Sequence, residues 1–244
     1  SKMKCRIIAD SKQAKTSLAS KRTHKSNLPS AVSTARGFVE MMANSGFDPN
    51  QRGLEFLVID FSDAFWMVPL AHSERKFFVI KYRGAFLVFA RTAQGSRGAP
   101  LTWAAVASLL ARVSQSLFMT KGKQCARLQV YVDDPILGMQ GSKTERRRMI
   151  VKFIIVFLCL GVCLAFDKAQ LGSCVVWVGV ELKLVDWSMI AAVTLEKLEA
   201  LLAIVLEMLS SNAIAVKSLR SLAGKATNVA TVVALWHLFQ RHSK

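Results

Sequence analysis

Residues 128–139 read LQVYVDDPILGM, two short apolar runs joined by the acidic pair Asp133-Asp134. Successive side chains of a strand point to opposite faces, so two adjacent acids serve one site only where the chain reverses. The stretch therefore predicts a hairpin with both acids at or beside its turn. Pro135 has no amide donor and is expected on an edge strand or at the hairpin exit. A polar turn with no further role is the alternative interpretation.

A third acid, Asp60, follows the apolar run 54–59, which has the pattern of a strand buried on both faces. A lone carboxylate at such a position is costly unless it is paired or bound to metal. The chain has only eight aspartates, so these three stand out. Carboxylates converging from two strands repel one another unless divalent cations neutralise them. Phosphoryl transfer uses two such cations, about 4 Å apart.

The rest of the chain predicts a mixed core followed by a helical end. Residues 76–82 and 85–91 are strand-like and are separated by the hairpin signal Arg83-Gly84. Other predicted elements are a helix over 30–43, a turn-rich loop over 94–100, a helix to about 113 with Pro100 in its first turn, a helix beginning near 145, a strand or hairpin over 175–184, and helices from 195, after Thr194 as N-cap, and from 216.

Composition narrows the class of partner. Hydrophobic residues make up 52% of the chain, which argues against disorder. Lys and Arg number 33 against 16 Asp and Glu, a net charge of +17 that suits nucleic acid or an anionic membrane surface. A solvated basic surface is the alternative. The longest uncharged apolar run, 153–166, is shorter than a membrane span and is expected to be a buried helix leading into a strand.

The five cysteines are odd in number and contain no C-x-x-C pair. This favours reduced thiols in an intracellular protein (cytoplasm or nucleus) over a disulfide framework or a zinc site. No secretory signal is recognisable. Both ends look cut, so the chain is expected to be a fragment of a longer protein.

Six segments, in order along residues 4–185, resemble the motifs of reverse transcriptases. Tyr131-Val132-Asp133-Asp134 resembles the signature catalytic hairpin, and DFSDAF at 60–65 resembles the second metal-binding motif, an acid followed five residues later by an aromatic. The other four matches are KCRIIAD at 4–10, QGSRGAP at 94–100, Asp167-Lys168, and WVGVEL at 177–182. The likeness is greatest to the polymerase segment of retrotransposon polyproteins.

The resemblance implies an α+β, right-hand polymerase fold with fingers, a palm containing an antiparallel sheet, and a helical thumb. The expected division is 1–53 fingers, 54–70 palm, 71–92 fingers hairpin, 93–190 palm, and 191–244 helical thumb or connection. The implied activity is RNA-directed DNA polymerisation by nucleotidyl transfer to a primer 3′ end. The implied partners are an RNA or DNA template with primer and deoxynucleoside triphosphates. A membrane is not an expected partner, and the oligomeric state is not indicated.

The resemblance also implies a role for each matched residue. Asp60, Asp133 and Asp134 would hold two Mg²⁺ ions, for which Mn²⁺ is a substitute, and Lys168 would donate a proton to pyrophosphate. The implied nucleotide-binding residues are Lys4, Arg6, Phe65, Gln94 and Arg97, and the implied primer-grip residues are Trp177 and Gly179. The ring of Phe65 would leave no room for a ribose 2′-hydroxyl and so select deoxynucleotides.

Two alternatives remain at this level. A truncated or drifted polymerase that binds nucleic acid without catalysis would keep the same motifs. A membrane-associated basic protein would use the charge and the 153–166 run. After Asp186 the only acids are three glutamates, so an RNase H acid cluster is not expected, and no zinc-finger, protease or integrase signal is recognisable.

Overall fold

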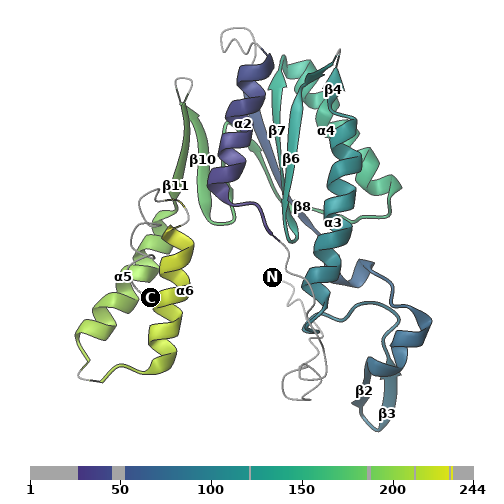
Figure 1. Ribbon diagram of the computed structural model, residues 1–244, viewed down its shortest axis with the longest axis vertical. Coiled ribbons are helices and arrows are strands. Elements are labelled where there is room, and N and C mark those ends of the chain that lie inside the picture. Colours follow the sequence, from purple (N-terminus) through teal and green to yellow (C-terminus); the bar gives the residue numbers. More distant parts are fainter. Residues whose placement is uncertain are drawn as a thin grey trace.

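The computed structural model describes residues 27–45, 53–120, 122–185, 188–211, 213–230 and 232. Figure 1 labels most of the elements within these ranges. They are, in order, α2 (Ala31–Ser45), β1 (Gly53–Phe61), the 3-10 helices η1 (Ala64–Met67) and η2 (His72–Phe77), β2 (Val79–Tyr82), β3 (Ala85–Val88), α3 (Ala99–Ser116), β4 (Met119–Thr120), β5 (Lys123–Gln124), β6 (Ala126–Tyr131), β7 (Asp134–Gly141), α4 (Lys143–Cys159), β8 (Leu164–Gly172), β9 (Cys174–Trp177), β10 (Val180–Val185), β11 (Ser188–Val193), α5 (Leu195–Leu209) and α6 (Val216–Ala230).

The centre of the molecule is an antiparallel sheet with the strand order β6-β7-β1-β8. Strand β1 occupies an inner position, paired with β7 on one side and β8 on the other. Its side chains alternate between two separate hydrophobic cores, as a strand covered on both faces requires. Leu54, Phe56 and Val58 enter one core, while Leu57, Ile59 and Phe61 enter the other. The predicted doubly buried strand is confirmed.

Each face of this sheet is covered by different elements. One core joins the sheet to helices α3 and α4 through Trp103, Phe153 and Phe157. The other joins it to α2 and to the sheet β11-β10-β9. On this second face α2 approaches closely, because Gly138 of β7 leaves room for the buried ring of Phe38. A Cβ at Gly138 would lie 2.4 Å from that ring.

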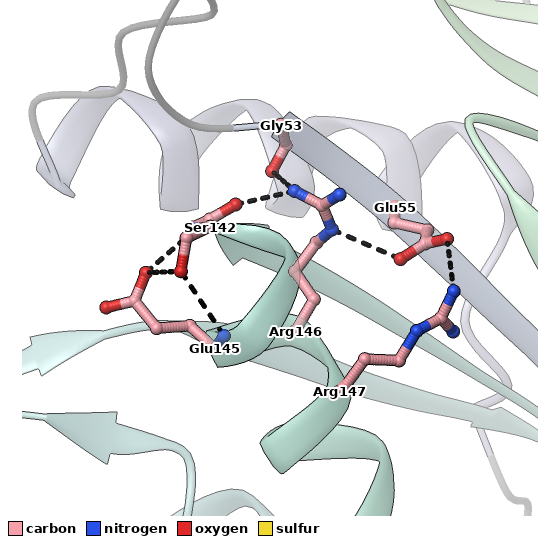
Figure 2. A network of polar contacts seen from close by, with 7 residues as sticks. Gly53, Glu55, Ser142, Glu145, Arg146 and Arg147 are labelled. Carbon is pink, nitrogen blue, oxygen red and sulfur yellow. Dashed lines mark hydrogen bonds and ion pairs between the residues drawn. The ribbon is translucent and has the colours of Figure 1, made fainter.

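Polar contacts fix the start of α4 against the start of β1 (Figure 2). Ser142 and Glu145 form a reciprocal capping box, in which each side chain accepts a hydrogen bond from the other's backbone amide. The next residue, Arg146, donates to Glu55 of β1 at 3.1 Å and to the carbonyl of Gly53 at 3.2 Å. Arg147 lies 3.7 Å from the other oxygen of Glu55. Arg146 and Arg147 therefore anchor the start of this helix to the sheet.

The β2–β3 hairpin projects from the sheet on one side (Figure 1). Its turn is formed by Arg83 and Gly84, both with positive φ (48° and 84°), the sign pattern of a type I′ turn. This confirms the predicted hairpin, although Lys76 and Phe77 belong to η2 and not to a strand. Phe86 is 71% exposed and Tyr82 is 55% exposed.

Helices α5 and α6 form a pair set apart from the central sheet (Figure 1). Both predicted helices are present, but the preceding residues form strand β11, which the sequence analysis missed, so the helical region starts at Leu195. Thr194 does occupy the N-cap position, yet its side chain makes no capping hydrogen bond. None of the described helices is long and apolar enough to cross a membrane.

Candidate active site

The turn between β6 and β7 consists of Val132 and Asp133, with Tyr131 paired to Asp134 across it. The predicted hairpin is confirmed, and both acids lie at the chain reversal. Pro135 is the second residue of β7 and pairs with Val130, which places it at the hairpin exit. Asp133 is also tied to β1, because its carbonyl accepts a hydrogen bond of 2.9 Å from the amide of Phe61.

Asp60 and Asp134 lie on adjacent strands. The register of β1 and β7 pairs Val58 with Ile136, and two further residues along each strand bring these two acids opposite each other. The pKa of Asp134 is raised from 3.8 to about 7, first by burial and then by its hydrogen bond with Asp60 and the charges of Asp133 and Asp60. Near neutral pH the two opposed carboxylates therefore share a proton.

Lys168 lies beside the same acids. Its Nζ is 3.1 Å from Oδ2 of Asp60, and its charge lowers the pKa of Asp134. The contact depends on an irregularity in β8: between Val58↔Gln170 and Asp60↔Ala165, β1 advances by two residues and β8 by five. The additional residues of β8 form a bulge that carries Lys168 to the acids.

These groups do not form a ready metal cage. No three His, Cys, Asp or Glu side chains within the described residues are arranged as metal ligands. What the structure holds is a pair of opposed carboxylates, a third acid in the adjoining turn and a lysine that partly neutralises them. A carboxylate cluster of this kind suits a hard divalent cation by its oxygen donors.

Two tryptophans hold the carbonyls on either side of Asp133. The indole Nε1 of Trp103 donates to the carbonyl of Val132 at 2.6 Å, and that of Trp177 donates to the carbonyl of Asp134 at 2.9 Å. Trp103 was not among the predicted site residues, because a tryptophan within an apolar helix is usually a core residue. Trp177 is fully buried and its ring meets Tyr131 edge-on, so any effect on a primer would be indirect.

The other predicted site residues belong to other segments of the chain. Phe65 is half-buried in η1, directly after β1, and packs against the core. Gln94 and Arg97 lie in the loop that leads into α3. Gly179, with a φ of 70°, lies in the β9–β10 turn. Lys4 and Arg6 fall outside the described residues.

A cavity of about 1020 Å³ borders the turn without containing the acids. It lies between α3 and β6 and includes Val132, Arg112 and Arg127 in its lining. This cavity and the acid cluster are thus neighbouring but separate features. The acids, with the raised pKa of Asp134 and the carboxylates of Asp60 and Asp134 facing each other, are the stronger indication of a reaction site.

No protein-family model matches this sequence, and no curated protein matches it. Similar solved structures exist. A foamy viral protease-reverse transcriptase in complex with double-stranded DNA has a TM-score of 0.61 at 17% identity, over 90% of this chain and 32% of the other. A foamy viral protease-reverse transcriptase in complex with an RNA/DNA hybrid has a TM-score of 0.54 at 20% identity, over 70% of this chain and 20% of the other.

The likeness establishes the fold. The predicted class, α+β with the right-hand polymerase fold and an antiparallel sheet, is confirmed. This chain spans between one fifth and one third of the length of these structures.

Proposed function

We propose that this chain is the polymerase core of a reverse transcriptase from a retrotransposon-type polyprotein, adding deoxynucleotides to a primer 3′ end. The observation that carries the proposal is the opposition of Asp60 and Asp134 on adjacent strands, with Asp133 in the adjoining turn, in a fold shared with reverse transcriptases. The division into fingers, palm and thumb given above remains a prediction.

The three acids fit a magnesium site by the chemistry of their donors. Magnesium usually keeps several waters and binds one or two carboxylates together with substrate phosphates, so a closed protein cage is not required. Asp60, Asp133 and Asp134 would hold two Mg²⁺ ions, with Mn²⁺ as substitute. When bound, the ions would neutralise phosphate charge and activate the primer hydroxyl.

Lys168 has two partners in this proposal. In the structure it neutralises Asp60. In the loaded site its ammonium would turn to the triphosphate and donate a proton to the leaving pyrophosphate. The proton shared by Asp60 and Asp134 would leave to solvent, since both carboxylates must then be ionised. Positioning and charge complementarity, more than covalent chemistry by the protein, would supply the rate enhancement.

The remaining predicted residues have binding roles. Phe65 would lie under the sugar and exclude a 2′-hydroxyl, which selects deoxynucleotides. Gln94 would position the nucleotide and Arg97 would lie close to its phosphates or the template. Lys4 and Arg6 are proposed to contact the triphosphate, where the planar donors of a guanidinium suit phosphate oxygens.

A template–primer is the proposed macromolecular partner. Three similar solved structures contain double-stranded DNA or an RNA/DNA hybrid, and the net charge of +17 suits a polyanion. The exposed β2–β3 hairpin pairs aromatic rings with cations: Lys81 lies 6.0 Å from the ring centre of Phe86, and Arg83 lies 5.3 Å from that of Tyr82. Aromatic rings beside basic groups suit stacked bases and phosphates.

The test is extension of a DNA primer on an RNA template with Mg²⁺. We expect extension by the unmodified chain and a loss of roughly 10³-fold in Asp133→Asn, since one charged group of a preorganised site is removed. Asp63→Asn is the matched control: Asp63 is exposed and has a φ of 53°, a conformation that asparagine tolerates. Binding of the duplex should weaken steeply with salt in all three proteins.

Robust extension by Asp133→Asn would contradict the metal-site assignment. The second candidate function is a catalytically inactive nucleic-acid-binding relic. It is favoured if the chain binds the duplex with the same salt dependence but extends no primer with Mg²⁺ or Mn²⁺. The shared proton and the Lys168 contact are common to both candidates, so activity is the deciding measurement.

A further inference from the structure

The backbone of Val132 is in an unfavourable conformation. Its φ is 55°, in the left-handed region, where a β-branched residue is a genuine outlier. Such strain is unfavourable and persists only where the surroundings hold it. Val132 immediately precedes Asp133, so any relaxation here would displace that carboxylate.

Three donors from three separate elements hold this turn. Trp103 of α3 binds the carbonyl of Val132 at 2.6 Å, the amide of Phe61 in β1 binds that of Asp133 at 2.9 Å, and Trp177 of β9 binds that of Asp134 at 2.9 Å. Three consecutive carbonyls thus each accept a hydrogen bond from outside the hairpin. The donor at Val132 acts directly on the strained residue.

The donor at Val132 is rigid. Trp103 is only 1% exposed, and its ring packs edge-on against Phe61, with centroids 5.5 Å apart. The same pair of residues therefore provides the donors for two adjacent carbonyls of the turn. A phenylalanine at position 103 would fill most of the same space but could not donate, so packing alone does not account for the contact.

We propose that Trp103 is a positioning residue of the site. Its indole N–H holds Val132 in the left-handed conformation and thereby keeps the carboxylate of Asp133 beside Asp60 and Asp134. The inference rests on the proposed function, because it takes these acids to bind a divalent cation. It adds a residue of α3 that touches neither the cation nor the nucleotide.

The test compares Trp103→Phe in two backgrounds, Val132 and Val132→Gly, in the full chain. With Val132 present, we expect Trp103→Phe to weaken Mn²⁺ binding, measured by calorimetry, by about 10–100-fold, the usual effect of losing support behind a metal ligand. The kcat of extension should fall by a similar factor, while the Kd for template–primer stays within about twofold.

Glycine at position 132 adopts a positive φ without steric cost. In that background the same substitution should change Mn²⁺ affinity by less than about threefold, because no strain remains to be held. Trp66→Phe is the matched control, since the ring of Trp66 packs against Phe89, which lies after β3. It should leave Mn²⁺ affinity unchanged.

A measurement on the unmodified chain covers the case in which Trp103→Phe does not fold. The indole N–H of Trp103 should exchange with deuterium far more slowly than that of Trp66. Equal exchange rates, unchanged Mn²⁺ affinity in Trp103→Phe, or the same loss in both backgrounds would each overturn the inference. If the chain extends no primer but its Mn²⁺ binding depends on Trp103, the proposed polymerase activity is overturned and the inference on Trp103 stands. If the chain binds no Mn²⁺, both are overturned.

Discussion

The β6–β7 and β9–β10 turns each contain a strained valine that is held by a different kind of side chain. Each begins with a valine in the left-handed region, Val132 with a φ of 55° and Val178 with a φ of 52°. In each, the carbonyl of that valine accepts a hydrogen bond from a helix side chain, from Trp103 at 2.6 Å and from Lys197 at 2.9 Å. Strain of this kind requires an external partner in both places.

The second positions of the two turns differ. Gly179 follows Val178 with a φ of 70°, whereas Asp133 follows Val132 with no positive φ. The donors differ as well, since Trp103 is fixed in the core while Lys197 is a long, flexible side chain of α5. The acidic turn is thus held by the core of the sheet, whereas the other turn connects the sheet region to the C-terminal helices.

The largest expected effect comes from Trp177, which joins the two hairpins. It lies in β9, is fully buried, and donates to Asp134 of the acidic turn. We expect Trp177→Ala to lower the free energy of unfolding by about 3–5 kcal/mol, as for large buried aromatics. Trp177→Phe, which keeps most of the ring, should cost about 1–3 kcal/mol for the unpaired carbonyl. Urea unfolding measures both, and equal costs would show that the hydrogen bond contributes nothing separate.

A second prediction concerns the charge of the β6–β7 turn, since the residues of the β9–β10 turn, Val178 and Gly179, carry none. The pKa of Asp134 is raised to about 7 in the folded chain. The folded state therefore keeps a proton that the unfolded state has lost, and this contribution to stability, complete below about pH 4, is lost as pH rises to 7. Without divalent cations, Asp134→Asn should be more stable than the unmodified chain at pH 8 by roughly 1–2 kcal/mol, after allowance for solvent screening.

The control for this prediction is the same pair of proteins at pH 4, where their stabilities should converge. Added Mg²⁺ should reverse the order at pH 8, because a cation stabilises only the chain that retains the carboxylate. Chemical unfolding of both proteins at the two pH values, with and without chelator, measures these differences in stability. An equal difference in stability between the two proteins at both pH values would contradict a proton shared by Asp60 and Asp134.

The smallest expected effect is at Gly179. A Cβ there would meet the side chain of Lys197 at 2.0 Å and would be strained at a φ of 70°. Since a lysine side chain can move aside, Gly179→Ala should cost only about 1 kcal/mol. Lys197→Met, which removes the donor and relieves the contact, is the matched variant. Faster amide exchange at the start of α5 in both variants, with Mn²⁺ affinity unchanged, would support the connecting role.

Sequence patterns predicted the fold well where local chemistry decides it. The doubly buried strand β1, the Asp133 turn and the Arg83-Gly84 hairpin depend on side-chain polarity and backbone preference over a few neighbouring residues, and all three are confirmed. Helix α4 was predicted to begin near 145 and begins at Lys143, whereas its ion pair with Glu55 was not predicted. Strand β11 was missed because it was assigned to the boundary of the helical region.

The site could be predicted only in part. The acids followed from their position at strand ends, but the contact of Lys168 with Asp60 depends on a bulge in β8 that no local pattern indicates. Trp103 was missed because its spacing is that of a core residue and its donor matters only once Val132 is known to be strained. The roles of Gln94, Arg97 and Phe65 remain predictions, as do those of Lys4 and Arg6.

The lysine beside Asp60 has one further consequence. The Lys168 ammonium already occupies the carboxylate cluster, so binding of the proposed divalent ion would exchange one cation for another. The ammonium thereby reduces the repulsion among the carboxylates as long as no divalent ion is bound. Such an exchange adds less net charge than filling an uncompensated site, and uptake should consequently depend less steeply on ionic strength than duplex binding does.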